Sequence, residues 1–265
     1  MIGQFNALIL AGSRGNHDPI ATLAGVSHKA LAPIAGRSML AWVAGALRSG
    51  GALNRLFICI DDGRLLDADP ELRELRNTPA VTIVPPGASP AGSLALALDH
   101  TGTDLPLLVT TADHPLLTNR MVAHFLQHAP EDCDLAVGLT DSATIQAAYP
   151  ENKRTYYRLG GMGYSGCNLF LARNARVRQV AEYWRRMEGR RKNPLAIAGA
   201  VGFLALIRFA LGWLSLDGAF AHISGLTGAR IRPVILPFAE AAIDVDKPAD
   251  YELASSILKL RPPVS

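Results

Sequence analysis

The sequence has few charged residues, few aromatic residues and few cysteines, and each shortage excludes a class of protein. Charged residues make up 18% of the 265 positions and aromatic residues 6%, whereas hydrophobic residues make up 49%. This balance provides enough apolar surface for a folded core and excludes a mostly disordered chain. The net charge of +3 is too small for a protein that coats nucleic acid, so no nucleic-acid partner is expected.

The three cysteines, Cys59, Cys133 and Cys167, are scattered and none belongs to a CxxC pair. A disulfide framework or a thiolate metal site is therefore not expected. The start of the chain also lacks the basic residues and the long apolar run of a cleavable secretion signal. The default expectation is a reducing, cytoplasmic setting.

Short apolar runs alternate with segments of helical periodicity through most of the chain. The strands are expected at 6–10, 56–60, 81–84, 106–110, 135–139, 168–171 and 231–236, and the helices at 39–48, 93–99, 119–128, 174–190 and 249–260. This alternation predicts an α/β fold with a mostly parallel, Rossmann-like central sheet flanked by helices. With no repeat or linker in the sequence, we expect a single domain over 1–265 with an inserted helical subregion over 174–226.

In such sheets, ligands bind at the carboxyl ends of the strands. This rule directs attention to the loops after Leu10, Val84 and Thr110. The first loop follows Leu10 and contains Gly12 and Gly15, whose backbone N–H groups can approach phosphate oxygens closely. It matches neither GxGxxG nor GxxxxGK[ST]. The second, over 86–94, is glycine-rich and reaches Ser93, which either contacts a nucleoside or only caps a helix.

Two acidic segments complete the pattern. The strand at 106–110 leads into Asp113. The carboxylate of Asp113 either binds Mg²⁺ as an oxygen ligand or caps the next helix. His114 is expected only to shape the loop, because imidazole suits softer metals. Near the end of the chain, Asp244 and Asp246 share a face if that stretch is extended. Asp250 fits an acid in the first turn of the closing helix.

These blocks, together with Lys29 and the segment 36–40, resemble the nucleotidyltransferases of the GT-A-like fold, in particular the MobA-like group around molybdenum-cofactor guanylyltransferase. The family pattern is roughly LAGGxGxR followed by K-x-L-x-x-x-x-G-x-x-[ML]-L, and the likeness covers 6–48, 81–118 and 231–258. Ser13 and His17 depart from it, standing where a glycine and an arginine are usual.

The resemblance implies a Mg²⁺ cofactor on Asp113 and Asp246, with Asp244 as the alternative to Asp246. It implies catalytic roles for Lys29, Asp113 and Arg14, with Lys29 and Arg14 stabilising the departing pyrophosphate. The residues expected to bind the nucleotide are Leu10, Ala11, Gly12, Ser13, Arg14, Gly15, Lys29, Pro86, Gly87, Gly92 and Ser93.

The acceptor side is less defined. Asn168 either binds an acceptor hydroxyl or satisfies a turn. Arg158, with Lys153 and Arg154, either meets an acceptor phosphate or forms a solvated basic face.

The segment 173–193 carries eight basic and two acidic residues, and it precedes an apolar run at 195–216 that is interrupted by Arg208. That run is long enough for a bilayer span of about 20 residues, but a span would break the fold. Two interpretations remain: a buried helical hairpin or homo-oligomer contact, or an anionic membrane surface contacted through 173–216. The second would place the protein at the inner face of the membrane.

The function expected is transfer of a nucleotidyl group from a nucleoside triphosphate, CTP or GTP, to a phosphorylated small-molecule or lipid acceptor, with release of pyrophosphate. One alternative is a GT-A-like glycosyltransferase that uses a nucleotide sugar, although Asp113 lacks the usual D-x-D context. Another is a non-catalytic nucleotide-binding protein that docks on membranes. Lys29, Asp113 and Asp246 argue against the latter.

Overall fold

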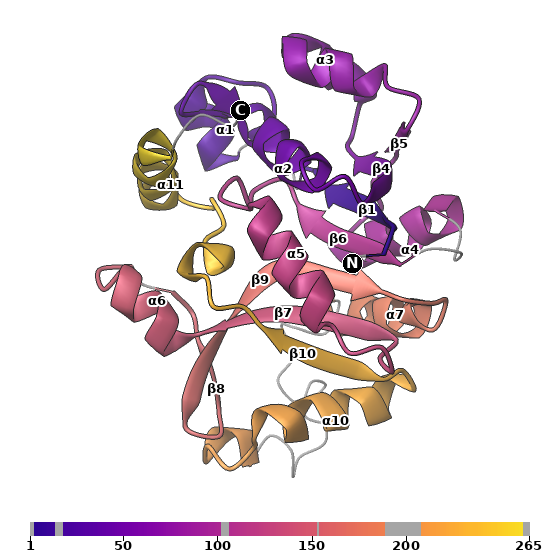
Figure 1. Ribbon diagram of the computed structural model, residues 1–265, viewed down its shortest axis with the longest axis vertical. Coiled ribbons are helices and arrows are strands. Elements are labelled where there is room, and N and C mark those ends of the chain that lie inside the picture. Colours follow the sequence, from indigo (N-terminus) through magenta and orange to yellow (C-terminus); the bar gives the residue numbers. More distant parts are fainter. Residues whose placement is uncertain (1–2, 14–17, 102–105, 153, 189–207, 262–265) are drawn as a thin grey trace.

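The central feature of the computed structural model is one twisted sheet with helices on both faces (Figure 1). The structure describes residues 3–13, 18–101, 106–152, 154–188 and 208–261. In these residues the sheet has eight strands, seven of them in the order β10-β7-β9-β6-β1-β4-β5, while β8 pairs with β9. The strands are β1 (Phe5–Leu10), β4 (Leu53–Cys59), β5 (Val81–Val84), β6 (Leu107–Thr111), β7 (Leu135–Asp141), β8 (Tyr157–Leu159), β9 (Met162–Ala172) and β10 (Ile231–Ile235).

The predicted α/β fold with a mostly parallel sheet is confirmed. β1 pairs in parallel with β4 and β6, and the β4–β5 and β10–β7 pairs are parallel too. β9 is the exception, because it runs antiparallel to both β6 and β7. The strand expected at 168–171 is the last part of β9, which begins at Met162.

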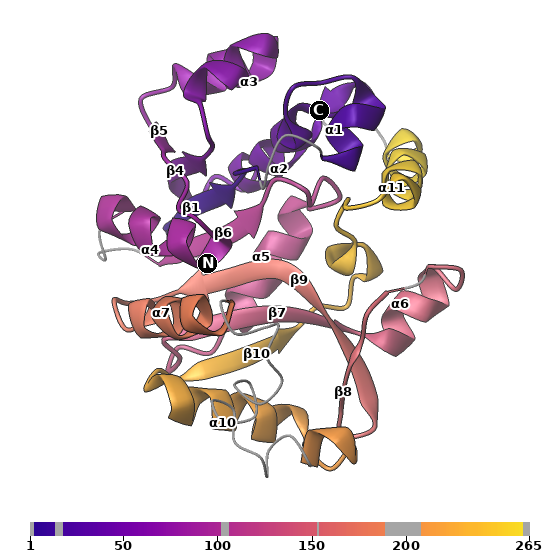
Figure 2. The ribbon, with the colours of Figure 1, turned by 180° about the vertical axis from the view of Figure 1, so that it is seen from behind.

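Two layers of helices cover the sheet (Figures 1 and 2). One layer contains α2 (Met39–Arg48) and α5 (Asn119–His128), and the other contains α4 (Pro90–Thr101), α7 (Val177–Glu188) and α10 (Leu216–Thr227). The alternation of β1 explains both layers: Ala7 and Ile9 belong to the core shared with α2 and α5, and Leu8 to the core shared with α4 and α7. The expected helical subregion over 174–226 thus includes α7 and α10, both of which pack against the sheet layer, while 189–207 lies outside the described residues.

The remaining elements are short or lie at the edges of the sheet. They are α1 (Pro19–Ala24), α3 (Pro70–Arg76), α6 (Ser142–Ala148), α11 (Pro248–Leu260), the hairpin β2 (Pro33–Ile34) and β3 (Arg37–Ser38), and the 3₁₀ turns η1 (Lys29–Leu31), η2 (Gly63–Ala68) and η3 (Ala239–Ala242).

A third apolar cluster fixes the closing segment of the chain against the site. Ile243 and Val245 are fully buried beside α1 and α11. Because side chains of an extended segment alternate, Asp244 and Asp246 are directed away from this cluster, as the sequence predicts. The backbone N–H of Val245 also donates to the carbonyl oxygen of Asp113 at 2.8 Å, which ties the closing segment to the end of β6.

Candidate active site

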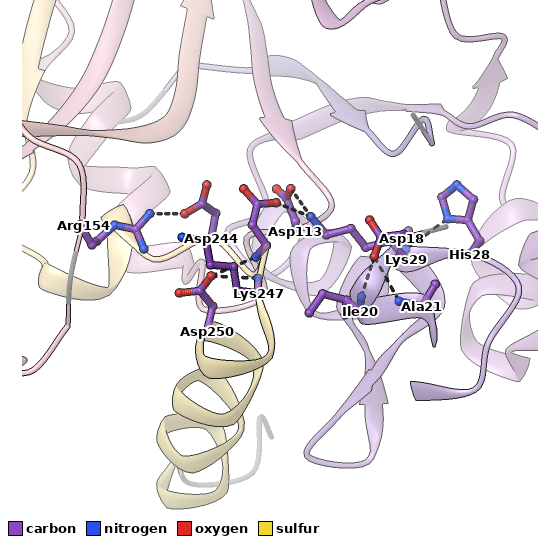
Figure 3. A network of polar contacts seen from close by, with 12 residues as sticks. Asp18, Ile20, Ala21, His28, Lys29, Asp113, Arg154, Asp244, Lys247 and Asp250 are labelled. Carbon is purple, nitrogen blue, oxygen red and sulfur yellow. Dashed lines mark hydrogen bonds and ion pairs between the residues drawn. The ribbon is translucent and has the colours of Figure 1, made fainter. Parts of the chain in front are cut away.

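The ammonium group of Lys29 joins two carboxylates from distant parts of the chain (Figure 3). Its Nζ donates to Oδ2 of Asp113 at 2.9 Å and to Oδ1 of Asp246 at 2.6 Å, although these residues are 84 and 217 positions away. The structure therefore brings three of the residues predicted from sequence to one point, next to the loop that follows β1.

Local structure positions each of the three groups. Lys29 opens η1, and His28 caps this turn by accepting the backbone N–H of Ala30 at its Nδ1. Asp113 follows β6 at the carboxyl edge of the sheet. The alternative role for Asp113, capping the next helix, is not seen, because the cap of α5 is Thr118.

Charge balance keeps Lys29 protonated at this site. Burial lowers the pKa of Lys29, but Asp113 and Asp246 raise it by more, so the net pKa lies above the ordinary value of 10.5. The Lys29 side chain is only 18% exposed. A fixed positive charge thus lies between two acids, in a place where phosphate oxygens can also approach it.

The donor set fits a magnesium ion. Oδ1 of Asp113 is buried and has no hydrogen-bond partner, so this carboxylate retains an oxygen for a ligand that the protein does not supply. In the described part of the chain, no group of three or more His, Cys, Asp and Glu residues could hold a metal. Two carboxylates completed by water and substrate phosphates are what Mg²⁺ commonly uses, so Asp113 and Asp246 are sufficient protein ligands.

Asp244, the alternative ligand, has a different partner. It accepts a hydrogen bond from Nη2 of Arg154.

His114 next to Asp113 is fully buried, and burial lowers its pKa to about 4. His114 is therefore neutral at pH 7.

The loop after β1 lines a cleft with η1 and the end of β6. The cleft is lined by Leu10, Ala11, Gly12, His28, Lys29, Ala30, Ala112 and Asp113. At Gly12 an added Cβ would lie 3.2 Å from Cβ of Pro86, so the small residue allows the first and second loops to approach each other. Ser13 lies at the end of this described stretch, and Arg14 and Gly15 lie outside the described residues.

Sequence reasoning missed Asp61, which holds this loop. Its Oδ2 accepts the backbone N–H of Ser13 at 2.7 Å and lies 3.2 Å from Nε2 of His28. Asp61 therefore links the first loop to the turn that carries Lys29. Its position just after β4 is the same signal that pointed to Asp113, an acid at the carboxyl end of a parallel strand.

The second loop differs from the expectation that Ser93 caps a helix, while the nucleoside contact of Ser93 stays a prediction. Ser93 is the fourth residue of α4 rather than its cap, and its Oγ accepts the backbone N–H of Gly87 at 3.0 Å. An added Cβ on Gly87 would lie 2.5 Å from the carbonyl carbon of Gly92, so this turn needs a glycine at position 87, whereas an added Cβ on Gly92 would meet no atom closer than 3.5 Å. Pro86 and these residues lie at the carboxyl end of β5, next to the first loop.

The acceptor residues named from sequence lie on the β8–β9 hairpin. Asn168 has a φ of 50° within β9, where the pairing with β7 shifts register. Arg158 is exposed on β8, opposite Gly163. In the described part of the chain, no hydrogen bond or ion pair joins Asn168 or Arg158 to Lys29, Asp113 or Asp246, and the roles of both residues stay predictions.

The sequence matches the model of the MobA-like NTP transferase domain over residues 7–200. The chain belongs to this family and is a nucleotidyltransferase, as the sequence analysis expected. None of the curated proteins is a significant sequence match.

Solved structures of transferases share the fold. A hypothetical transferase from Thermus thermophilus is 32% identical, with a TM-score of 0.78 over 94% of this chain and 99% of that one. A 4-diphosphocytidyl-2C-methyl-D-erythritol synthase from Anaerococcus prevotii DSM 20548 is 10% identical, with a TM-score of 0.62 over 97% and 96% of the two chains. A CMP:2-keto-3-deoxy-manno-octonic acid synthetase complexed with CTP is 15% identical, with a TM-score of 0.58 over 97% and 98%. The last two likenesses show the fold alone.

Proposed function

We propose that the protein is a Mg²⁺-dependent nucleotidyltransferase that transfers a nucleoside monophosphate to a phosphorylated acceptor and releases pyrophosphate. The observation that carries the proposal is the position of Lys29 Nζ between Asp113 and Asp246, beside the loop at 10–12. A phosphate-binding cation and two metal-binding acids in one cleft are the groups that this reaction needs.

The chain's own residues bind and orient the reactants. Backbone N–H groups of the first loop hold the triphosphate, and Lys29 balances the negative charge that develops on the departing pyrophosphate. Arg14 adds a second positive charge in this proposal. Asp113 and Asp246 hold Mg²⁺, which when bound neutralises charge on the phosphate oxygens. An acceptor phosphate is already an anion, so the reaction needs no general base.

The triphosphate is CTP or GTP in this proposal. The likeness to two structures whose names contain a cytidyl or CMP group supports CTP, and the resemblance of the sequence motifs to the group around molybdenum-cofactor guanylyltransferase supports GTP. The contacts to the base would come from the second loop around Gly87 and Gly92, whose backbone distinguishes bases without a diagnostic side chain.

Pyrophosphate release tests the activity. The purified protein is incubated with Mg²⁺, each of the four ribonucleoside triphosphates and a panel of sugar, polyol and polyprenyl phosphates. Release with CTP or GTP that stops on addition of EDTA is the expected result. Turnover of nucleotide sugars without pyrophosphate would instead indicate a glycosyltransferase, and binding without turnover of any substrate would indicate a non-catalytic protein.

The proposal extends to how the acceptor is presented. Four large apolar side chains are exposed on the segments that flank 189–207: Trp184, Phe209, Leu211 and Trp213. Arg185, Arg186 and Arg208 are exposed on the same segments. Exposed tryptophans next to arginines favour an anionic bilayer surface as the partner, because the rings enter the interface and the cations face lipid phosphates. None of the described helices is long and apolar enough to cross a membrane.

Vesicle flotation tests this part. We expect co-flotation with vesicles that contain anionic phosphatidylglycerol at low salt, and loss of it in the double variant Trp184→Ser/Trp213→Ser. A matched control is Leu23→Ser, which removes an exposed apolar side chain on α1. If the wild type does not float but elutes as a dimer on gel filtration, the exposed residues form an oligomer contact instead.

A further inference from the structure

Arg154 is largely shielded from solvent and paired with Asp244 rather than part of a solvated basic face. It lies between α6 and β8, and its side chain is only 12% exposed. Its Nη2 donates to Oδ1 of Asp244, whose side chain is 28% exposed. Among the described residues, Asp244 is the hydrogen-bonding partner of Arg154, and a guanidinium has further N–H donors that one carboxylate oxygen does not use.

The Arg154–Asp244 pair and Lys29 lie on opposite sides of Asp113 in Figure 3. Figure 3 shows Arg154 and Asp244 at one end of a row of charged groups, Asp113 and Lys29 in the middle, and His28 at the other end. His28 is tied through Asp61 to the first loop. Asp244 is two residues from Asp246 on a segment fixed by the Val245–Asp113 backbone hydrogen bond. The distance from the acids to the guanidinium is therefore set by the fold.

The geometry of in-line displacement relates the position of Arg154 to the proposed reaction. The attacking oxygen and the departing oxygen lie on opposite sides of the phosphorus that is transferred. If the first loop and Lys29 hold the triphosphate end, the acceptor must approach from the other side of Asp113. Figure 3 labels two cations on the Asp244 side of Asp113, Arg154 and Lys247, and Arg154 is the one that donates a hydrogen bond to Asp244.

We infer that Arg154, positioned by Asp244, binds the phosphate of the acceptor. The inference rests on the proposed function. In the step, an oxygen of the acceptor phosphate forms a bond to the α-phosphorus. The bond from that phosphorus to the oxygen bridging the α- and β-phosphates breaks, and pyrophosphate leaves with this oxygen and its electron pair. Arginine suits this role because its planar fork can donate two parallel hydrogen bonds to a phosphate.

Inorganic phosphate serves as the probe for this subsite. It is titrated by calorimetry into the protein saturated with Mg²⁺ and the α,β-methylene analogue of CTP or GTP, so that the triphosphate site is filled. We expect the wild type to bind phosphate and Arg154→Gln to bind it about tenfold to a hundredfold more weakly. The Kd of the analogue should change by less than about twofold.

Arg76→Gln is the matched control. It breaks another Arg–Asp pair, in which Nη1 of Arg76 lies 2.7 Å from Asp67, on α3 and remote from the site. Phosphate binding in this variant should equal that of the wild type. If Arg154→Gln does not fold, Arg154→Lys and Asp244→Asn replace it: both should weaken phosphate binding and leave the Kd of the analogue unchanged.

Three results would overturn the inference: no phosphate binding by the wild type, equal phosphate binding in the Arg154 variants, or equal losses for phosphate and the analogue. The last result would mean that the Arg154–Asp244 pair has only a structural role. Failure of the proposed function is seen separately, since it would appear as no pyrophosphate release by the wild type with any triphosphate and acceptor.

Discussion

The carboxylate of Asp61 lies 3.2 Å from Nε2 of His28 and also accepts the backbone N–H of Ser13. One side chain thereby links the two segments that we propose to face the triphosphate, the loop after β1 and the turn that carries Lys29. The carboxyl edge of a parallel sheet brings such loops together, and contacts of this kind set their spacing.

Replacing Asp61 by Ala removes this link. We expect the KM for the triphosphate to rise about fivefold to thirtyfold, because a hydrogen bond to a charged group is lost at a loop that must be ordered on binding. The turnover number should change less, since the proposed mechanism gives Asp61 no contact with either reactant. Steady-state kinetics give both values, with Asp67→Ala on the surface near α3 as the control. An unchanged KM would show that Asp61 does not order the loop.

The Lys29 charge should make stability depend on pH in the alkaline range. Because the pKa of Lys29 in the folded protein is raised above 10.5, its ion pairs stabilise the native state fully below that value. The contribution is lost as pH rises through the folded pKa. Urea denaturation of the wild type and Lys29→Met from pH 8 to 12 should therefore show a constant difference in unfolding free energy at first and a shrinking one above pH 10.5. A difference that grows with pH would contradict this assignment.

The Gly87 turn should not accept a side chain. Alanine at this position would bring Cβ to 2.5 Å from backbone carbon of Gly92, so the second loop must shift away from the first. We expect Gly87→Ala to lose about 1–3 kcal/mol of stability and most of its nucleotide affinity. Gly225→Ala is the matched control, because no atom lies within 4 Å of its added Cβ. Thermal denaturation and triphosphate titration distinguish the two variants.

The three cysteines should be unreactive in the native protein. All three are buried and free, and burial raises the pKa of the Cys167 thiol to about 12. Ellman's reagent should therefore modify none of them until urea unfolds the chain. Rapid reaction of one thiol at pH 8 would show that its surroundings open in solution.

Much of the fold and of the catalytic centre could be predicted because both depend on local patterns. Runs of apolar residues predict the parallel strands, and the parallel arrangement predicts that the loop after Leu10 and Asp113 lie at one edge. That Lys29 and Asp246 join Asp113 there is implied by the resemblance to the family pattern. The strand expected at 168–171 covers only the end of β9, and the β8–β9 hairpin is not predicted from the sequence. Gly160 and Gly161, with φ values of 57° and 83°, form the tight turn between two paired strands.

The parts of the candidate site that are not predicted depend on contacts between side chains. The sequence suggests that Arg154 is a cation and Asp244 a ligand, but their ion pair depends on how η3 and the segment before β8 pack, which no local pattern encodes. Ser93 is similar, because its hydroxyl is taken by Gly87 within the same loop. The structure is needed to decide whether a polar side chain of this kind stabilises the fold or binds the substrate, because the decision depends on its neighbours.

Pyrophosphate release by aspartate variants tests the central claim most directly. With CTP or GTP and a phosphate acceptor, the wild type should release pyrophosphate in proportion to bound Mg²⁺, and both Asp113→Asn and Asp246→Asn should reduce kcat about a hundredfold or more. Asp67→Asn should behave as the wild type. Full activity in either Asp113→Asn or Asp246→Asn would contradict the account, because the reaction would then proceed without one of the two acids that Lys29 joins.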